Sequence, residues 1–245
     1  MPEGPSLVIL KEAVMPYIGK KILEARGNAK IDMDRLRQQK ILNIRTWGKQ
    51  FFICLKDTTI RIHFLMFGSY SIGEQTKPDK SLRLSLRFSK GSIYFYTCAV
   101  RLINEDLDSL YDWQADVMSD QWKPAKARKK LKALPATMVC DALLDQQVFS
   151  GVGNIIKNEV LYHIRLHPET LVGDIPARKL TALVNEARNY SFDFLKWKKE
   201  FVLRKHWLAH TKKICKRCDL PMIKKYSGKT KRRTFFCENC QVRYS

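Results

Sequence analysis

Apolar residues recur at helical spacing near the start of the chain. They are Leu7, Leu10, Val14, Tyr17 and Ile18. Pro5 suits the first turn of a helix, where an amide hydrogen has no partner to lose, and Gly19 suits the end. The pattern therefore predicts an amphipathic helix that starts directly behind Glu3.

Between positions 21 and 97 the pattern changes to short apolar runs rich in Ile, Leu, Phe and Thr, most of them separated by turn residues. The predicted strands are 41–47, 50–55, 59–64, 82–88 and 92–97. Several short strands at this spacing favour a sandwich or a barrel over a parallel α/β sheet.

Helical spacing returns after a seam at 119–124. A helix-like run over 143–149 is followed by a Gly-x-Gly turn at 151–153, and Asn154 suits the N-cap of the next helix. Glycines in such a turn let backbone amides approach a phosphate, and the dipole of the following helix favours the anion. A tight turn without any ligand fits the same pattern. A further long helix is predicted over 176–197.

Composition adds a partner to this picture. The 245 residues include 45 Lys and Arg against 24 Asp and Glu, a formal charge of +21, and 45% of them are hydrophobic. This is too apolar for a disordered polycation. The charge predicts nucleic acid as partner, since aromatic residues interleave with basic ones; an acidic membrane or a merely solvated surface are the alternatives. No apolar run spans a bilayer and no signal-peptide pattern is present, so we expect a cytosolic protein without a membrane partner.

The seven cysteines fall into two classes. Three stand singly among apolar neighbours and suit a reducing compartment: Cys54, Cys98 and Cys140. The other four form two Cys-x2-Cys pairs separated by 18 residues: Cys215, Cys218, Cys237 and Cys240. Two such pairs predict one structural zinc ion held by four thiolates, with stray thiols or a redox pair as alternatives. The basic residues between the pairs predict a small hairpin, folded by the metal, that fits a DNA groove.

The first residues have chemistry of their own. Removal of Met1 ahead of a small residue would leave Pro2 with a free secondary amine, one residue from the carboxylate of Glu3. An α-amine has a reference pKa of roughly 8, so much of it is uncharged and nucleophilic near neutral pH. The alternative is a frayed terminus that merely precedes a helix.

Two places in the strand-rich half allow two interpretations each. Lys49 follows Gly48 in a turn between apolar strands, and it is either directed into a groove or an ordinary hairpin lysine. Leu65, Met66 and Phe67 lead into a Gly-Ser turn. They are either the end of a core strand or an exposed wedge that enters a base stack.

In their order along the chain, these motifs resemble those of the formamidopyrimidine-DNA glycosylase and endonuclease VIII family. They are the N-terminal Pro-Glu, the Gly-Lys turn, the Leu-Leu-Asp-Gln and Gly-Val-Gly-Asn stretch over 143–154, and the four-cysteine finger. The resemblance implies an α+β fold of two domains. An N-terminal β-sandwich with a leading helix (1–120) would precede a helical helix-two-turn-helix domain (121–210) that carries a β-hairpin zinc finger (211–245).

The resemblance also implies the reaction of a bifunctional DNA glycosylase and AP lyase in base excision repair. Pro2 would attack C1′ of a damaged nucleotide and form a Schiff base, with Glu3 as its acid/base partner. Lys49 would assist as a proton donor near the phosphate and the base. Asn154 would hold a phosphate. Arg232, five residues before the third finger cysteine, would bind the phosphate beside the lesion and aid the second of two eliminations.

A base-flipping enzyme must fill the gap left in the duplex. The family places the filling residues in a loop that corresponds to 63–68, so Leu65, Met66 and Phe67 are expected to be this wedge. Residues 98–104 lack the Asp-Pro-Arg-Arg-Phe run of the formamidopyrimidine branch and keep only Arg101 as an expected DNA contact, with Leu102 in the place of the aromatic.

Two features concern the start of the chain. Position 6 is Ser where the family commonly has Glu, which affects the expected local contacts of the first helix but not the roles of Pro2 and Glu3. Gly4 matches an endonuclease VIII type of start. Together with the missing Asp-Pro-Arg-Arg-Phe run, this match leads us to expect oxidised pyrimidines as substrates, with 8-oxoguanine and formamidopyrimidines as the alternative.

The expected partner is double-stranded DNA with an oxidised base or an abasic site. The protein is expected to be a monomer with one zinc ion and a cytoplasmic, nucleoid-associated location of bacterial type. A DNA-binding zinc protein without catalysis, or an RNA-associated zinc ribbon, would keep the charge and the finger without needing the Pro2 amine.

Overall fold

A computed structural model describes residues 2–245 and divides the chain into two compact units, the first ending at Tyr111 and the second running from Asp112 to Ser245. The three-part division at 120 and 210 stays a prediction. Each unit has a hydrophobic core of its own.

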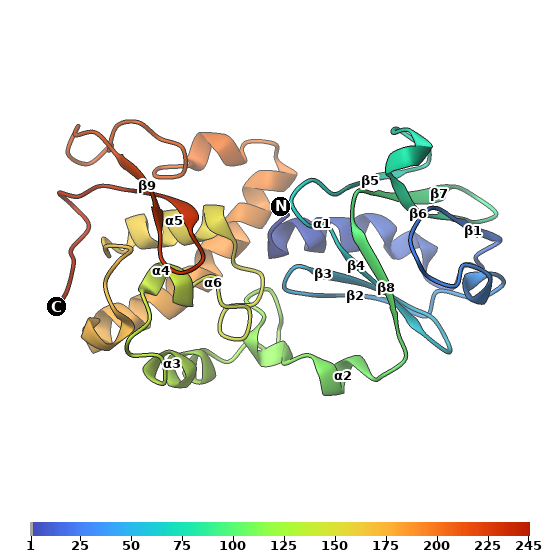
Figure 1. The fold of residues 1–245 in the computed structure, drawn as a ribbon, viewed down its shortest axis with the longest axis horizontal. Coiled ribbons are helices and arrows are strands. Elements are labelled where there is room, and N and C mark those ends of the chain that lie inside the picture. The colour runs from blue at the N-terminus through green and yellow to red at the C-terminus, as the bar shows by residue number, and fades with distance from the viewer. Residues whose placement is uncertain (1) are drawn as a thin grey trace. The chain divides into compact units, whose positions relative to one another are not determined.

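The first unit is a β-sandwich with a leading helix (Figure 1). Its elements are α1 (Gly4–Val14), β1 (Glu24–Arg26), β2 (Asn43–Trp47), β3 (Gln50–Cys54), β4 (Thr59–His63), β5 (Ser69–Ile72), β6 (Leu82–Arg87), β7 (Ser92–Tyr96), β8 (Ala99–Ile103) and the short α2 (Leu107–Leu110). Within the described residues, one antiparallel sheet has the order β1-β6-β7-β5 and the other β2-β3-β4-β8. The inward faces of both sheets and of α1 form one core.

The helix α1 ends earlier than predicted. It stops at Val14 and continues as a 3-10 turn over Met15–Tyr17. Pro16 has no amide hydrogen to continue the α-helical ladder, which explains the change. Gly19 lies beyond this turn in the left-handed conformation, with φ +80°.

The five strands predicted from the sequence are confirmed as β2, β3, β4, β6 and β7. The strands β1, β5 and β8 carried too little apolar alternation to be predicted. They are short, and all three lie at sheet edges, where a strand pairs on one side only.

The second unit packs helices around an apolar core and ends in a β-hairpin. Its elements are α3 (Pro124–Lys132), α4 (Val139–Ala142), α5 (Asn154–His163), α6 (Ala177–Lys199), β9 (Ile223–Ser227) and β10 (Arg232–Phe236). The long helix predicted over 176–197 is confirmed as α6. The strands β9 and β10 pair antiparallel, and β10 lies against α5.

None of the helices formed by residues 2–245 combines the length and the apolar character that a membrane crossing requires.

Candidate active site and nucleic-acid interface

The start of α1 holds the two residues predicted to carry the chemistry. Glu3 takes the N-cap position, and its carbonyl accepts a hydrogen bond from the Ser6 amide at 2.8 Å. Its side chain is 4% exposed, while Pro2 is half-buried. The positive end of a helix stabilises a negative charge nearby, so a carboxylate fits this position. Met1, and with it the expected removal of Met1, lies outside the described residues.

Lys49 lies in the turn between β2 and β3, next to Gly48 at φ +55°. The helix α1 packs on both of these strands. In Figure 1 the β2–β3 turn and the first turn of α1 lie at the same end of the unit. The first unit therefore contains all three residues predicted to act on the sugar and base.

His63, the last residue of β4, is a neighbour of Lys49 that the sequence did not single out. Burial, followed by the charges of Lys49 and Arg61, lowers the pKa of His63. Its Nδ1 accepts a hydrogen bond from the amide of Leu65 at 3.3 Å. His63 is therefore neutral at pH 7 and positions the start of the loop that follows.

That loop contains the three residues for which the sequence left two interpretations. Leu65, Met66 and Phe67 are 46%, 50% and 79% exposed, whereas Phe64 before them is buried in the core. The core interpretation is therefore wrong for these three side chains. A Cβ on Gly68 would collide with the backbone of Phe64, so this glycine allows the tight turn that presents the loop. Their function as a wedge stays a prediction.

Arg101 is exposed on β8, directly opposite Arg61 on β4. The two arginines line one hollow of about 330 Å³ together with Glu105 and Tyr111. Like charges placed opposite each other on neighbouring strands repel, so an anion near this hollow is favoured. Leu102 is partly buried, packs against the core and also lines this hollow.

In the second unit, Gln146 braces the Gly-x-Gly turn. Its side-chain amide donates to the carbonyls of Leu144 and Val152 at 2.8 and 3.1 Å, and its Oε1 accepts from the amide of Gly151 at 3.1 Å. Gly151 has φ +99°. The predicted Asp-Gln and Gly-x-Gly motifs thus form one structural element.

Asn154 does not cap the helix as predicted. It is the first residue of α5, and Gly153 occupies the N-cap position. The side-chain Nδ2 of Asn154 donates to the carbonyl of Arg233 at 2.9 Å. The reason is that β10 offers an acceptor that the isolated sequence does not reveal. The contact brings Asn154 beside the strand that begins with Arg232, so two predicted phosphate contacts belong to one assembly.

Two further residues of α5 hold β10. Lys157 is buried and donates to the hydroxyl of Thr234 at 2.8 Å. Asn158 Oδ1 accepts from the amide of Phe235 at 3.3 Å. Successive side chains of a strand point to opposite faces, so Arg232 and Arg233 project in different directions. The charge of Arg233, after burial and Lys157, helps to lower the pKa of His210 to about 4.

Part of the positive charge of α3 is paired within the second unit. Lys126 and Lys130 bind the carboxylate of Asp112 at 2.9 and 2.8 Å. The same helix also carries Arg128, Lys129 and Lys132.

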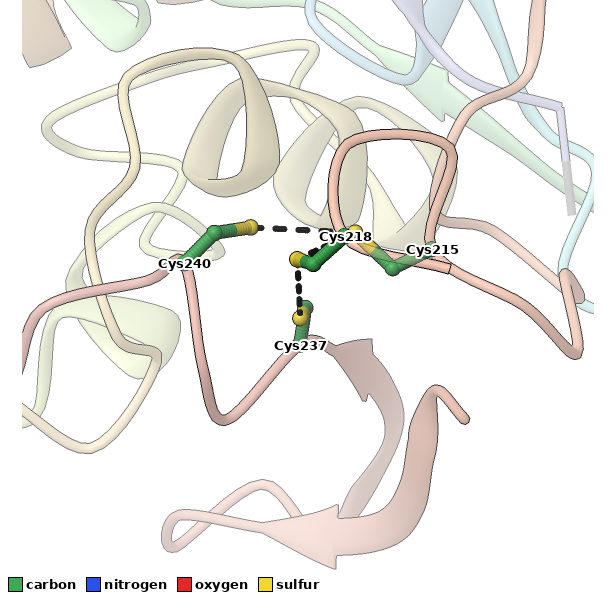
Figure 2. Close-up of side chains that lie close together, drawn as sticks. All are labelled: Cys215, Cys218, Cys237 and Cys240. Carbon is green, nitrogen blue, oxygen red and sulfur yellow. Dashed lines mark hydrogen bonds between the residues drawn. The ribbon is translucent and has the colours of Figure 1, made fainter. Parts of the chain in front are cut away.

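The four finger cysteines converge (Figure 2). Their sulfur atoms all lie within 4.8 Å of one another, with 3.4 Å between Cys215 and Cys218, 3.5 Å between Cys218 and Cys237 and 3.8 Å between Cys215 and Cys240. A zinc ion with four sulfur ligands at ~2.3 Å has S···S edges of about 3.8 Å. The distances are far longer than a disulfide bond, and the cysteines are free thiols. The cluster therefore fits a structural zinc site.

Groups around Cys215 favour a negatively charged sulfur there, whereas burial raises the pKa of the Cys240 thiol to about 12. The Tyr162 hydroxyl lies 3.3 Å from Cys215 Sγ, and the Arg217 guanidinium lies 4.0 Å from Cys240 Sγ. Burial alone would raise the pKa of the Cys215 thiol, but hydrogen bonds from Tyr162 and from the backbone of Arg217 lower it to about 6. Donors of this kind support thiolate ligands in metal sites.

Comparison with known proteins agrees with this architecture. Residues 1–102 match the formamidopyrimidine-DNA glycosylase N-terminal domain, and residues 114–191 match the H2TH domain of the same enzymes. The structure is similar to Lactococcus lactis formamidopyrimidine-DNA glycosylase bound to abasic-site DNA, with TM-score 0.86, 20% identity, and coverage of 98% of this chain and 100% of that chain. The fold class is therefore the two-domain α+β fold of these glycosylases, as the sequence predicted.

Proteins with similar sequences identify the family within this class of glycosylases. Endonuclease 8-like 3 of Xenopus laevis is 31% identical over 231 residues, 90% of this chain and 38% of that protein. Formamidopyrimidine-DNA glycosylase of Yersinia enterocolitica is 28% identical, and the alignment covers 98% of this chain and 100% of that protein. The chain belongs to the formamidopyrimidine-DNA glycosylase and endonuclease VIII family of base excision repair glycosylases and AP lyases.

The chain matches only part of the endonuclease 8-like relatives. The chain spans 38% of the Xenopus protein and 34% of the corresponding mouse protein. Both are vertebrate proteins, so they lend no support to the bacterial-type location expected from the sequence.

Proposed function

We propose that the chain is a bifunctional DNA glycosylase and AP lyase that removes oxidised bases, pyrimidines in preference, through a Schiff base on Pro2. The observation that carries the proposal is the buried carboxylate of Glu3 beside half-buried Pro2 at the positive end of α1. A secondary amine next to a buried acid is what imine chemistry on a sugar requires. The proposal needs a free α-amine on Pro2 and therefore the removal of Met1.

The reaction begins when the nitrogen of Pro2 attacks C1′ of the damaged nucleotide and the bond from C1′ to the base breaks. Lys49 donates a proton to the departing base, and the Glu3 carboxylate takes the proton that the Pro2 nitrogen loses on bonding to C1′. Glu3 then gives this proton to the ring oxygen O4′, the C1′–O4′ bond opens, and the lone pair of Pro2 forms an iminium ion with C1′.

The iminium makes the C2′ hydrogen acidic. Loss of this proton expels the 3′ phosphate by β-elimination, and loss of the C4′ proton then expels the 5′ phosphate by δ-elimination. Water finally hydrolyses the C1′–N bond and returns the Pro2 amine. Protons move only among the nucleotide, Pro2, Glu3, Lys49 and water, so neither an oxidant nor a reductant is needed.

The other predicted residues bind the DNA in this proposal. Asn154 and Arg232 bind phosphates, Arg101 contacts the duplex, and the exposed loop of Leu65, Met66 and Phe67 enters the space left by the flipped base. Zinc, bound by the four thiolates, supplies folding energy to the hairpin. The formal charge of +21 favours a polyanionic partner.

Borohydride trapping on duplex DNA tests the reaction. Borohydride reduces an iminium to a stable amine, so the wild-type chain should become covalently attached to DNA that carries 5-hydroxyuracil or an abasic site. A chain with one extra residue ahead of Pro2 is the matched control, since it keeps every side chain and loses the amine. Absence of an adduct with wild type, or an equal adduct with the blocked chain, would refute the mechanism.

Two companion measurements complete the test. Mass spectrometry of the purified chain establishes whether Pro2 is its first residue. Parallel substrates with 5-hydroxyuracil and 8-oxoguanine test the preference for pyrimidines, which is wrong if the purine is excised faster.

A further inference from the structure

The tip of the β9–β10 hairpin is attached to α4 by one carboxylate. Asp141 Oδ2 accepts from the amide of Lys229 at 2.7 Å. Its Oδ1 accepts from the amide of Thr230 at 3.2 Å and from the Thr230 hydroxyl at 2.7 Å. A single side chain therefore provides partners for three donors of a loop of four residues, 228–231.

The backbone of the tip is shaped to receive this carboxylate. Gly228 has φ +71°, and a Cβ built there would collide with the carboxylate of Asp141. Lys231, at the other end of the loop, has φ +44° although it is not a glycine. A non-glycine residue adopts this conformation only where its surroundings hold it. The Lys231 amide donates to the carbonyl of Gly228 at 3.3 Å, which closes the tip whose two central residues Asp141 binds.

The rest of the hairpin is fixed by different residues. Glu169 accepts from Lys225 at 2.6 Å and from the hydroxyl of Ser227 at 3.3 Å, which holds β9. Asn154 donates to the carbonyl of Arg233 and holds β10. Arg232 lies between the Asp141-bound Thr230 and the Asn154-bound Arg233, so its backbone is fixed on both sides.

We propose that Asp141 is a positioning residue for Arg232. The inference rests on the function proposed above, in which Arg232 binds the phosphate beside the lesion and aids the second elimination. The Asp141 carboxylate accepts hydrogen bonds from two backbone amides of loop 228–231 and so orders this loop before DNA binds. Without it, the loop must be ordered during binding, and the geometry at the phosphate loses precision.

Asp141→Ala tests this, with Asp120→Ala as the control, because Asp120 is an exposed carboxylate of the same unit and its loss removes the same charge. On abasic duplex DNA we expect Asp141→Ala to lower single-turnover δ-elimination about tenfold, while trapping at saturating DNA stays within about twofold of wild type. Zinc content should stay at one ion per chain. Asp141→Asn, whose Oδ1 still accepts from Thr230, should recover part of the rate.

Combination with Arg232→Ala separates positioning from general structural damage. If Asp141 acts through Arg232, the double variant should eliminate no more slowly than Arg232→Ala alone, since coupled residues are not additive. Additive losses, or an Asp141→Ala variant that behaves like Asp120→Ala, would overturn the inference.

The same variants distinguish this inference from the reaction itself. If wild type forms the covalent adduct but Asp141→Ala eliminates as fast as wild type, only the positioning role is refuted. Wild type that forms no adduct refutes the proposed function. In that case fluorescence anisotropy still decides whether Asp141 acts through Arg232. It measures the affinity of wild type, Asp141→Ala, Arg232→Ala and the double variant for duplex DNA with a tetrahydrofuran abasic analogue.

Discussion

Glu159 gives the sharpest test of how the second unit holds α5 to the segment before its four-cysteine finger. It lies in α5, is fully buried, and accepts hydrogen bonds from three consecutive backbone amides. They belong to Leu208, Ala209 and His210, at 2.8, 3.0 and 2.6 Å. One carboxylate therefore connects α5 to the segment that leads into the zinc finger.

The cost of Glu159→Gln follows from these contacts. The amide oxygen of Gln accepts from two of the three donors, and its NH2 group faces the third. One buried amide without a partner costs about 1–3 kcal/mol. Glu159→Ala leaves three amides without partners and a cavity, so at least about 3 kcal/mol should be lost.

The pH dependence gives a second signature. Burial raises the pKa of Glu159 above its ordinary value of 4.5, and the three backbone amides oppose this increase. A raised folded-state pKa stabilises the fold below pH 4.5, and this contribution is lost as pH rises through the folded-state pKa. The stability of wild type relative to Glu159→Gln should therefore fall as pH rises above 4.5.

Urea unfolding followed by circular dichroism measures both effects. Glu200→Gln is the control, because Glu200 is exposed at the end of α6 and should change stability by less than about 0.5 kcal/mol. If Glu159→Gln unfolds at the same urea concentration as Glu200→Gln, the three amides do not depend on the carboxylate and the reasoning is wrong.

Three further predictions concern the metal and the first unit. Elemental analysis should find one zinc per chain, and a chelator or Cys237→Ser should lower the urea midpoint of the second unit; an unchanged midpoint contradicts a folding role for zinc. Lys49→Ala should slow excision of 5-hydroxyuracil about 10²-fold in single-turnover assays, whereas Lys56→Ala, at the exposed β3–β4 turn, should not. Phe67→Ala should leave stability within about 0.5 kcal/mol, since the side chain is 79% exposed, and should weaken binding to lesion duplex; equal affinity would exclude a wedge role.

Much of the architecture could be predicted because it is encoded locally. Apolar periodicity located α1, α6 and five strands, since burying one face of a helix or strand requires a regular spacing. The Cys-x2-Cys pairs predicted the cluster for a similar reason, because two cysteines three positions apart can reach the same metal ion. Short edge strands such as β5 escaped prediction, because few of their positions are buried.

The interpretation of single residues needed the fold. Phe64 and Phe67 are equally apolar neighbours, yet one is in the core and the other faces solvent. The sequence predicted Asn154 as a helix cap, but its side-chain amide donates to the carbonyl of Arg233 on β10, 79 positions later in the sequence. Local pattern cannot tell these outcomes apart, because the competing partner is distant in the chain.

The sequence alone thus predicted the periodic elements and the four-cysteine cluster, and it led to the proposal that Pro2 and Glu3 are the reactive start. Tertiary structure decided which groups these elements meet. Asp141 binds a hairpin tip 88 positions later, and Glu159 binds amides about 50 positions later. The physical reason is that a hydrogen bond between distant segments depends on how cores pack, and it leaves no spacing along the chain from which it can be predicted.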